Sequence, residues 1–248
     1  SGGGPLTVAL DRMQVSKGIV LTGFRGSFAT AGGLSGDFTG RVNGDVPVQG
    51  SVVPVGKRAA IRIRATDAGA ALRAAGIFSR GVGGTLDLTL NPRVAAGEYD
   101  GNLAIGQIRV TDVPALAELL DAISVVGLLA QLNGPGILFT DVKGDFRLTP
   151  EAVEIRGGSG VGPSLGISAA GTYMLGSERL DVQGTISPVY MLNGIGQIFT
   201  KRREGLFGFN YRLTGVAGDP AVSVNPLSIL TPGMFRDIFR SEPPTLNR

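Results

Sequence analysis

Apolar and polar residues alternate along most of this chain, which is the pattern of strands that bury one face and leave the other in water. Ile61 and Ile63 alternate with arginines, and the run FGFNYRL alternates in the same way. Gly and Pro separate these runs, as expected for tight turns. The pattern predicts strands over residues 6–15, 17–30, 34–42, 46–53, 59–64, 85–90, 99–111, 137–148, 152–156, 165–173, 179–186, 207–214 and 222–224.

One long stretch, residues 112–133, has helical spacing instead and is predicted to form a single helix. Asp112 is expected to cap its first turn, Pro114 suits an early helical position, and Gly134 with Pro135 ends it. Its apolar face is predicted to contain Leu116, Leu120, Ile123 and Val126.

This helix has two interpretations, because its second half is apolar on nearly all sides and must be covered. It is either a core helix that closes a sheet, or a plug or lip at the end of a lipid-holding cavity. A membrane span is disfavoured, because Glu118 and Asp121 would lie within the ~20 residues that a span requires.

The pattern R-x-T-D-x-x-A occurs at residues 64–70 and again at residues 109–115. Each copy predicts a strand, a Thr-Asp cap, a helix rich in Ala and Leu, a glycine turn and another strand. The shared order predicts a duplicated strand–helix–strand unit, near residues 59–90 and 103–146. A short helix that recurs against strands is expected to shield a sheet face or to fill one end.

The predicted fold class is mainly β: a long, strongly twisted antiparallel meander, curled into a U-shaped groove or open barrel. Two or three short helices are expected to cap or fill it. A dozen strands at ~4.7 Å would extend ~55 Å, and so long a sheet twists and curls. We expect one domain over residues 5–240, a cloning remnant at residues 1–4 and a frayed tail at residues 241–248. A closed β-sandwich is the alternative.

The composition argues against catalysis, because the chain has no His and no Cys. The commonest general base, the commonest metal ligand and thiolate ligands are therefore missing, and no spacing suits zinc or an EF-hand. The glycine-rich residues 157–166 lack the Lys-Ser/Thr of a phosphate loop, so a glycine-rich hairpin or bulge is favoured. We expect no enzyme, no catalytic residue, no cofactor and no metal.

The net charge of +3 is small, and neither clustered basic residues nor interleaved aromatics indicate a nucleic-acid partner. One basic cluster follows an apolar run and consists of Lys201, Arg202 and Arg203. It is either a contact for phosphate head groups or a solvated turn.

The second half of the chain resembles the bacterial AsmA-like family. The resemblance rests on the helix at residues 67–72 with GGTL after it, the residue-112 helix followed by residues 136–139, the run GTISPVYMLNGIGQI, and above all residues 205–240. It implies a long U-sectioned β-groove in the periplasm, tethered by an inner-membrane helix and linked to phospholipid transport toward the outer membrane. This chain would then be the C-terminal portion of a periplasmic region whose anchor lies outside it.

The leading hypothesis is therefore a module that holds or conducts phospholipid acyl chains between the inner and outer membranes. Glycines on the inner face would leave width for an acyl chain. The predicted lane contains Ile61, Ile63, Leu86, Leu88, Leu180, Val182, Phe207, Phe209 and Leu213. Expected partners are phospholipid and a membrane surface or envelope proteins at the groove ends. The competing hypothesis is a non-catalytic structural domain, a closed sandwich that docks an envelope partner.

Overall fold

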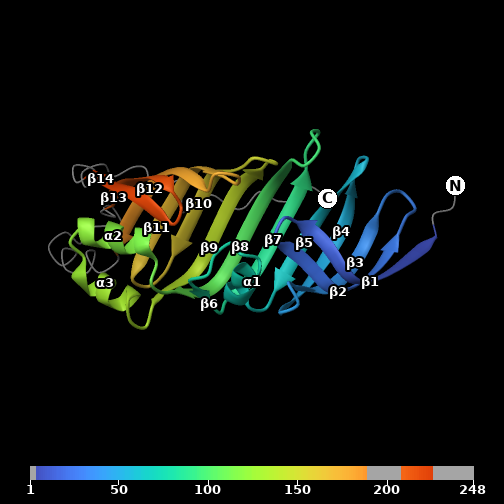
Figure 1. The fold of residues 1–248 in the computed structure, drawn as a ribbon, viewed down its shortest axis with the longest axis horizontal. Coiled ribbons are helices and arrows are strands. Elements are labelled where there is room, and N and C mark those ends of the chain that lie inside the picture. The colour runs from blue at the N-terminus through green and yellow to red at the C-terminus, as the bar shows by residue number, and fades with distance from the viewer. Residues whose placement is uncertain (1–3, 189–207, 226–248) are drawn as a thin grey trace, which may run out of the picture.

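The computed structural model describes residues 4–188 and 208–225, and every strand in them belongs to one antiparallel sheet (Figure 1). Consecutive strands pair with each other throughout, except that the two-residue β6 pairs with β8 beside the main path. The strands are β1 (Pro5–Ser16), β2 (Ile19–Ala29), β3 (Ser35–Val42), β4 (Val46–Val55), β5 (Arg58–Ala65), β6 (Gly81–Val82), β7 (Thr85–Pro92), β8 (Tyr99–Val110), β9 (Ile137–Leu148), β10 (Ala152–Val161), β11 (Leu165–Met174), β12 (Arg179–Pro188), β13 (Phe209–Val216) and β14 (Asp219–Asn225).

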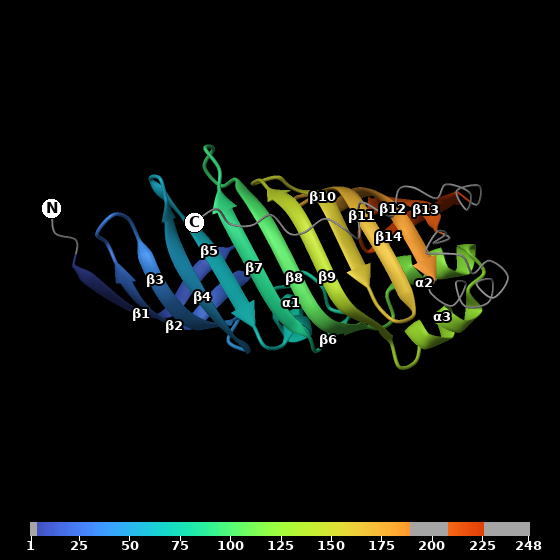
Figure 2. The ribbon, with the colours of Figure 1, turned by 180° about the vertical axis from the view of Figure 1, so that it is seen from behind.

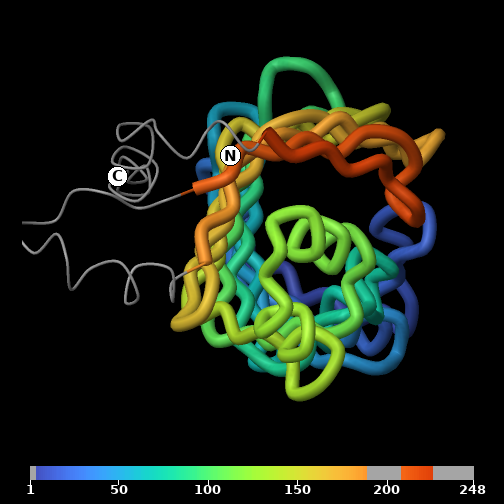
Figure 3. The backbone as a smooth tube through the Cα atoms, turned by 90° about the vertical axis from the view of Figure 1, so that its left-hand side faces the viewer, coloured from blue at the N-terminus to red at the C-terminus, as the bar shows by residue number. Residues whose placement is uncertain are grey.

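Three short helices lie on the concave side of this sheet: α1 (Ala68–Ala74), α2 (Pro114–Ala122) and α3 (Val126–Leu132). They stand in front of the strands in Figure 1 and behind them in Figure 2. Viewed along the long axis, the strands curve around the helices (Figure 3). The predicted fold class, a curled antiparallel meander with two or three short helices, is confirmed.

The sheet stays open, because β1 and β14 are its two edges and do not pair with each other. The predicted alternative of a closed β-sandwich is therefore wrong. The two edges differ. β14 is short, contains Pro220 and contacts α2, whereas β1 is long and exposed along nearly its whole length. Leu6 and Leu10 of β1 are 44% and 40% exposed. Among the described residues, none covers the main-chain groups on the outer side of β1.

The glycine-rich residues 157–161 continue β10, and the pairing register shifts between Ile155 and Gly157–Gly158. This is the β-bulge that the sequence favoured over a phosphate loop. The first predicted cap also forms: Asp67 accepts a hydrogen bond of 2.9 Å from the backbone N–H of Ala70. The two-residue β6 was not predicted, because so short a pairing has no period to detect.

The predicted single helix over residues 112–133 is wrong: the structure has α2 and α3 with a break between them. Ser124 adopts a left-handed backbone with φ 57°, and the N–H of Val125 bonds to the carbonyl of Leu120 at 2.9 Å. This Schellman-type ending lets both Ile123 and Val125 turn into the core. In a continuous helix, residues two apart point in nearly opposite directions, so one of the two would face solvent.

The predicted cap at Asp112 is also wrong. The residue that precedes α2 is Val113, and α2 has no side-chain cap. Asp112 itself has φ 49°, a left-handed conformation that Asp tolerates better than most residues, and it turns the chain out of β8 instead. Pro114 does occupy the first turn of α2, as expected.

The convex face carries a cluster of ion pairs across β7–β10. Asp100 lies 2.7 Å from Arg93, 3.1 Å from Arg156 and 3.7 Å from Arg147. Partial burial opposes ionisation of Asp100, but the hydrogen bond from Arg93 and the charges of the other arginines outweigh it, so its pKa lies below the usual range. The cluster links β8, β9 and β10 to the turn that follows β7, on the face opposite the helices.

Candidate functional site

One row of side chains crosses the whole sheet without a polar residue. Each member is the cross-strand partner of the next, so all of them project from the same face. We call it the apolar row; from β1 to β14 it contains Leu6, Phe28, Gly36, Val52, Ile61, Leu90, Gly101, Phe146, Ile155, Gly171, Val182, Leu213 and Val222. Strand spacings of ~4.8 Å make this row about 58 Å long.

The adjacent row on the other face is polar. Along the main path from β1 to β9 it contains Thr7, Ser27, Asp37, Ser51, Arg62, Thr89, Asn102 and Asp145. The helices pack on the apolar face, so the concave side is apolar and the convex side is polar. A curled sheet of this kind forms a groove whose wall is apolar along its length.

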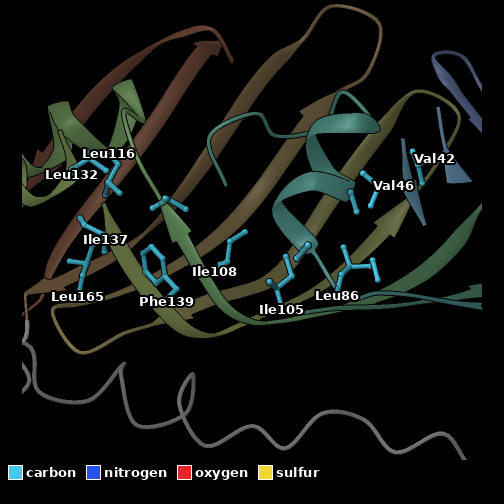
Figure 4. Packing of buried hydrophobic residues seen from close by; sticks show 14 of the residues in the cluster. Val42, Val46, Leu86, Ile105, Ile108, Leu116, Leu132, Ile137, Phe139 and Leu165 are labelled. Atoms are coloured by element: carbon cyan, nitrogen blue, oxygen red, sulfur yellow. The ribbon is translucent and has the colours of Figure 1, made fainter. Parts of the chain in front are cut away.

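The helices cover only part of the concave face. Figure 4 shows Leu86, Ile105, Ile108 and Phe139 projecting from the sheet toward them. The first three are no more than 8% exposed, and Leu119, Leu120 and Leu132 of the helices are 1% exposed or less. We call this packed region the covered zone. Its residues form a close-packed core.

The rest of the concave face, toward the turns at residues 93–98 and 149–151, is not covered by α1, α2 or α3. Its apolar side chains are only partly buried over five consecutive strands of the main path, β5 and β7 to β10. We call this region the open lane; its members are Ile61, Ile63, Leu88, Leu90, Leu103, Phe146 and Ile155. Partly exposed apolar side chains in one continuous concave strip are a surface that a hydrocarbon chain fits.

The predicted lane residues divide between these two regions. Those that are partly exposed on the concave face are Ile61, Ile63, Leu88, Leu180 and Leu213. Those that are buried in the core are Leu86, Val182 and Phe209. Phe207 lies outside the described residues, as do Lys201, Arg202 and Arg203 and the predicted tail at residues 241–248.

The predicted helix face divides in a similar way. Leu116, Leu120 and Ile123 are buried, with at most 8% exposure. Val126 is 74% exposed, because the break at Ser124 starts a new helix at this residue and turns it outward. Val126 therefore does not belong to the covering face.

Not every glycine of the concave face leaves room in the groove for an acyl chain. A Cβ at Gly26, Gly50 or Gly101 would meet the ring of Phe28, Phe38 or Phe146 at 2.3 Å or less, so aromatic rings already occupy that space. Gly144 is different. A Cβ there would meet only the Cβ of Leu103, at 3.7 Å, and its cross-strand partner in β10 is another glycine, Gly158. Side chains therefore project least into the open lane at the pair Gly144 and Gly158.

Sequence reasoning missed four members of the open lane: Leu90, Leu103, Phe146 and Ile155. The positions of the two hairpin turns could have identified these four residues. Pairing residue 92 with residue 99, and residue 148 with residue 153, brings these four residues onto the face of Ile61 and Ile63.

The groove contains few groups for chemistry. Tyr211 is buried and donates a hydrogen bond of 2.6 Å to the carbonyl of Ser168, and burial raises its pKa. In residues 4–188 and 208–225, no three acidic side chains gather where they could hold a metal ion. Within the same ranges, none of the helices has the length and hydropathy of a membrane span. No family model, curated protein or solved structure matches this chain.

Proposed function

We propose that this domain holds the acyl chains of phospholipids in its concave groove and passes them along without chemistry. The observation that carries the proposal is the apolar row, which crosses thirteen paired strands without one polar side chain. The open lane, which crosses five of these strands, is about 19 Å wide, comparable with the ~15 Å depth of one leaflet's hydrocarbon, so the acyl chains of one lipid fit in it.

The physical argument concerns which part of a phospholipid the groove can take. The seven described residues of the open lane offer no charged side chain and no main-chain donor beyond those paired in the sheet, so a head group would lose its hydration there without compensation. Acyl chains lose nothing of that kind and gain from the burial of apolar surface, about 25 cal/mol per Å². We infer that the tails lie in the lane and the head group stays in water at its open side.

The resemblance to the AsmA-like family gives this proposal its setting. The domain would be the C-terminal module of a periplasmic lipid-transfer protein, anchored in the inner membrane by a segment outside this chain and carrying phospholipid toward the outer membrane. Its ends would meet a membrane surface or envelope proteins. The alternative is a non-catalytic interaction domain, which the loading experiment distinguishes because such a domain needs no lipid.

The test is lipid loading, measured by native mass spectrometry of the purified domain and by uptake of fluorescent phospholipid from vesicles. Gly144→Trp places a large ring at the lowest point of the lane, where the backbone accepts a side chain without strain. Loading should fall at least about fivefold. Ala104→Trp is the matched control, because Ala104 is exposed on the convex face of the adjacent strand.

A second pair of variants separates the lane from the core. Leu88→Asp should abolish loading with the fold retained, because Leu88 is partly exposed in the open lane. Phe209→Asp should unfold the domain, because Phe209 is 7% exposed within the core. The proposal fails if the wild-type domain takes up no phospholipid, or if Gly144→Trp and Leu88→Asp load as well as Ala104→Trp.

A further inference from the structure

The segment that follows α1 places two large apolar side chains in solvent. Ile77 is 67% exposed and Val82 is 56% exposed. Arg73 and Arg80 flank Ile77 in the sequence. Arg109 is the cross-strand partner of Val82, and its guanidinium donates to the carbonyls of Pro135 and Gly136 at 3.3 Å. We call this surface the α1 tip; it consists of Lys17, Arg73, Ile77, Arg80, Val82 and Arg109.

Ile77 is held outward by a defined turn. The N–H of Ile77 bonds to the carbonyl of Leu72 at 2.9 Å, and Gly76 has φ 69°, which is the geometry of a Schellman ending of α1. In that motif the residue at the position of Ile77 usually packs back on the helix. Here Phe78 turns inward instead and packs near Gly81, so Ile77 remains in water.

The α1 tip is also tied to the first two hairpins of the sheet. The side-chain amide of Asn43 donates to the carbonyl of Gly18 at 2.9 Å and to the carbonyl of Ala74 at 2.6 Å, and its oxygen accepts from the N–H of Val20. This brings the turn that carries Lys17 beside the end of α1. At the other end, the N–H of Thr111 bonds to the carbonyl of Arg80 at 3.1 Å. Hydrogen bonds to the neighbouring turn and to the end of β8 therefore hold the α1 tip in place.

The net charge of this region is positive. Residues 15–18, 41–45, 73–82 and 109–112 include five basic residues and two acidic ones, Asp45 and Asp112. The asymmetry extends further: residues 4–90 contain ten basic and five acidic residues, while residues 91–188 and 208–225 contain seven basic and twelve acidic ones. A negatively charged partner would therefore approach the α1 side of the molecule first.

We propose that the α1 tip docks on the surface of a bilayer that contains anionic phospholipid, with Ile77 and Val82 entering the interface and Lys17, Arg73, Arg80 and Arg109 facing the head groups. Apolar side chains surrounded by cations are the combination that binds such a surface, because each component alone gives weak, reversible attachment. This inference concerns a face of the domain, not the cargo of its groove, and it stands or falls separately from lipid loading.

The chain has no tryptophan, so a single introduced one reports on its own surroundings. Ile77→Trp is titrated with vesicles of phosphatidylcholine containing one third phosphatidylglycerol. The emission of the introduced indole should shift to the blue on binding, and raising the salt concentration should weaken binding because it screens the basic residues. Val94→Trp is the matched control, because Val94 is 99% exposed in the turn between β7 and β8, on the other rim of the sheet. Its emission should not shift.

Flotation with the same vesicles tests the contribution of each component. Ile77→Asp should lower the partition coefficient at least about tenfold, since it places a charge where an apolar side chain would enter the interface. Arg80→Glu should lower it about twenty-fivefold on anionic vesicles, from two charge units at about fivefold each. Arg179→Glu, an exposed arginine of the other rim, is the control and should leave binding within about twofold of wild type.

Three results would overturn the proposal. The first is failure of the wild-type domain to float with anionic vesicles, and the second is a blue shift in the Val94→Trp variant but not in the Ile77→Trp variant. The third is a concentration-dependent dimer in sedimentation experiments that Ile77→Asp converts to monomer, because the tip would then be an interface between copies of this chain. Equal binding to pure phosphatidylcholine would overturn the role of the basic residues.

Discussion

The covered zone and the open lane are built from the same kinds of residue on the same face of one sheet, yet they end in opposite states. Leu86 of β7 and Ile105 of β8 are 8% and 4% exposed where the helices cover the concave face. Leu88 and Ile63, on strands with the same alternation, remain partly in water. The difference lies in what packs above the strands. One region contributes stability, and the other leaves apolar surface in contact with water at a cost in stability.

The largest expected effect comes from truncating the covered zone. Leu120→Ala should lower the free energy of unfolding by about 3 kcal/mol, through lost burial and the cavity left behind. Leu88→Ala should cost about 1 kcal/mol, because that side chain is already partly in water in the folded state. Urea denaturation measures both values. Equal losses would mean that the open lane is ordinary core and would contradict the comparison.

A smaller effect should separate two glycines of the groove wall. Gly171 has φ 148°, and a Cβ there would lie 2.1 Å from the carbonyl oxygen of Asp181, so Gly171→Ala should destabilise the domain by about 1–3 kcal/mol. Gly144→Ala should be neutral or stabilising by up to about 1 kcal/mol, because nothing crowds the new methyl group. If the lane were packed at Gly144, Gly144→Ala would also lower the midpoint of thermal unfolding, which differential scanning calorimetry would show.

The smallest effect is expected on the convex face. Asp100→Asn should lower the free energy of unfolding by about 1 kcal/mol at pH 7, since exposed networks contribute little per pair. The folded state depresses the pKa of Asp100, so its contribution is present above the usual carboxylate pKa of about 3.9 and is lost as pH falls through the lower folded value.

Urea denaturation from pH 7 to pH 2 should therefore show wild type and Asp100→Asn converging in acid. Asp11→Asn is the control, because Asp11 is fully exposed and its nearest cation is 3.9 Å away. A difference between wild type and Asp100→Asn that persists at pH 2 would show that the effect is structural and not electrostatic.

Local patterns predicted much of the fold. Alternation identified most of the long strands to within a few residues, and Ile137–Leu148 matches its prediction at both ends. The strand predicted over residues 152–156 continues five residues further, through its glycines. The cap at Asp67 was predictable because it involves residues three apart. The break at Ser124 was not, because a left-handed Ser has no strong signal and the gain from burying both Ile123 and Val125 depends on distant strands.

The candidate site was only partly predictable, for a related reason. The sequence indicates which face of a strand is apolar, and Ile61, Ile63 and Leu88 are in the open lane as placed. It does not indicate which part of that face a helix will cover. That depends on α2 reaching across the groove to β14, a contact between segments about a hundred residues apart. Phe209 and Leu86 were therefore assigned to the lane but are in the core.

The bare edge at β1 makes the length of the groove an adjustable quantity. Each strand of the main path bonds only to its neighbours in sequence, so a further hairpin set against β1 would disturb no existing pair. Every added hairpin would lengthen the trough by two strand spacings, about 10 Å. The length of the trough is therefore set by the number of hairpins, and it can change without altering the strands already present.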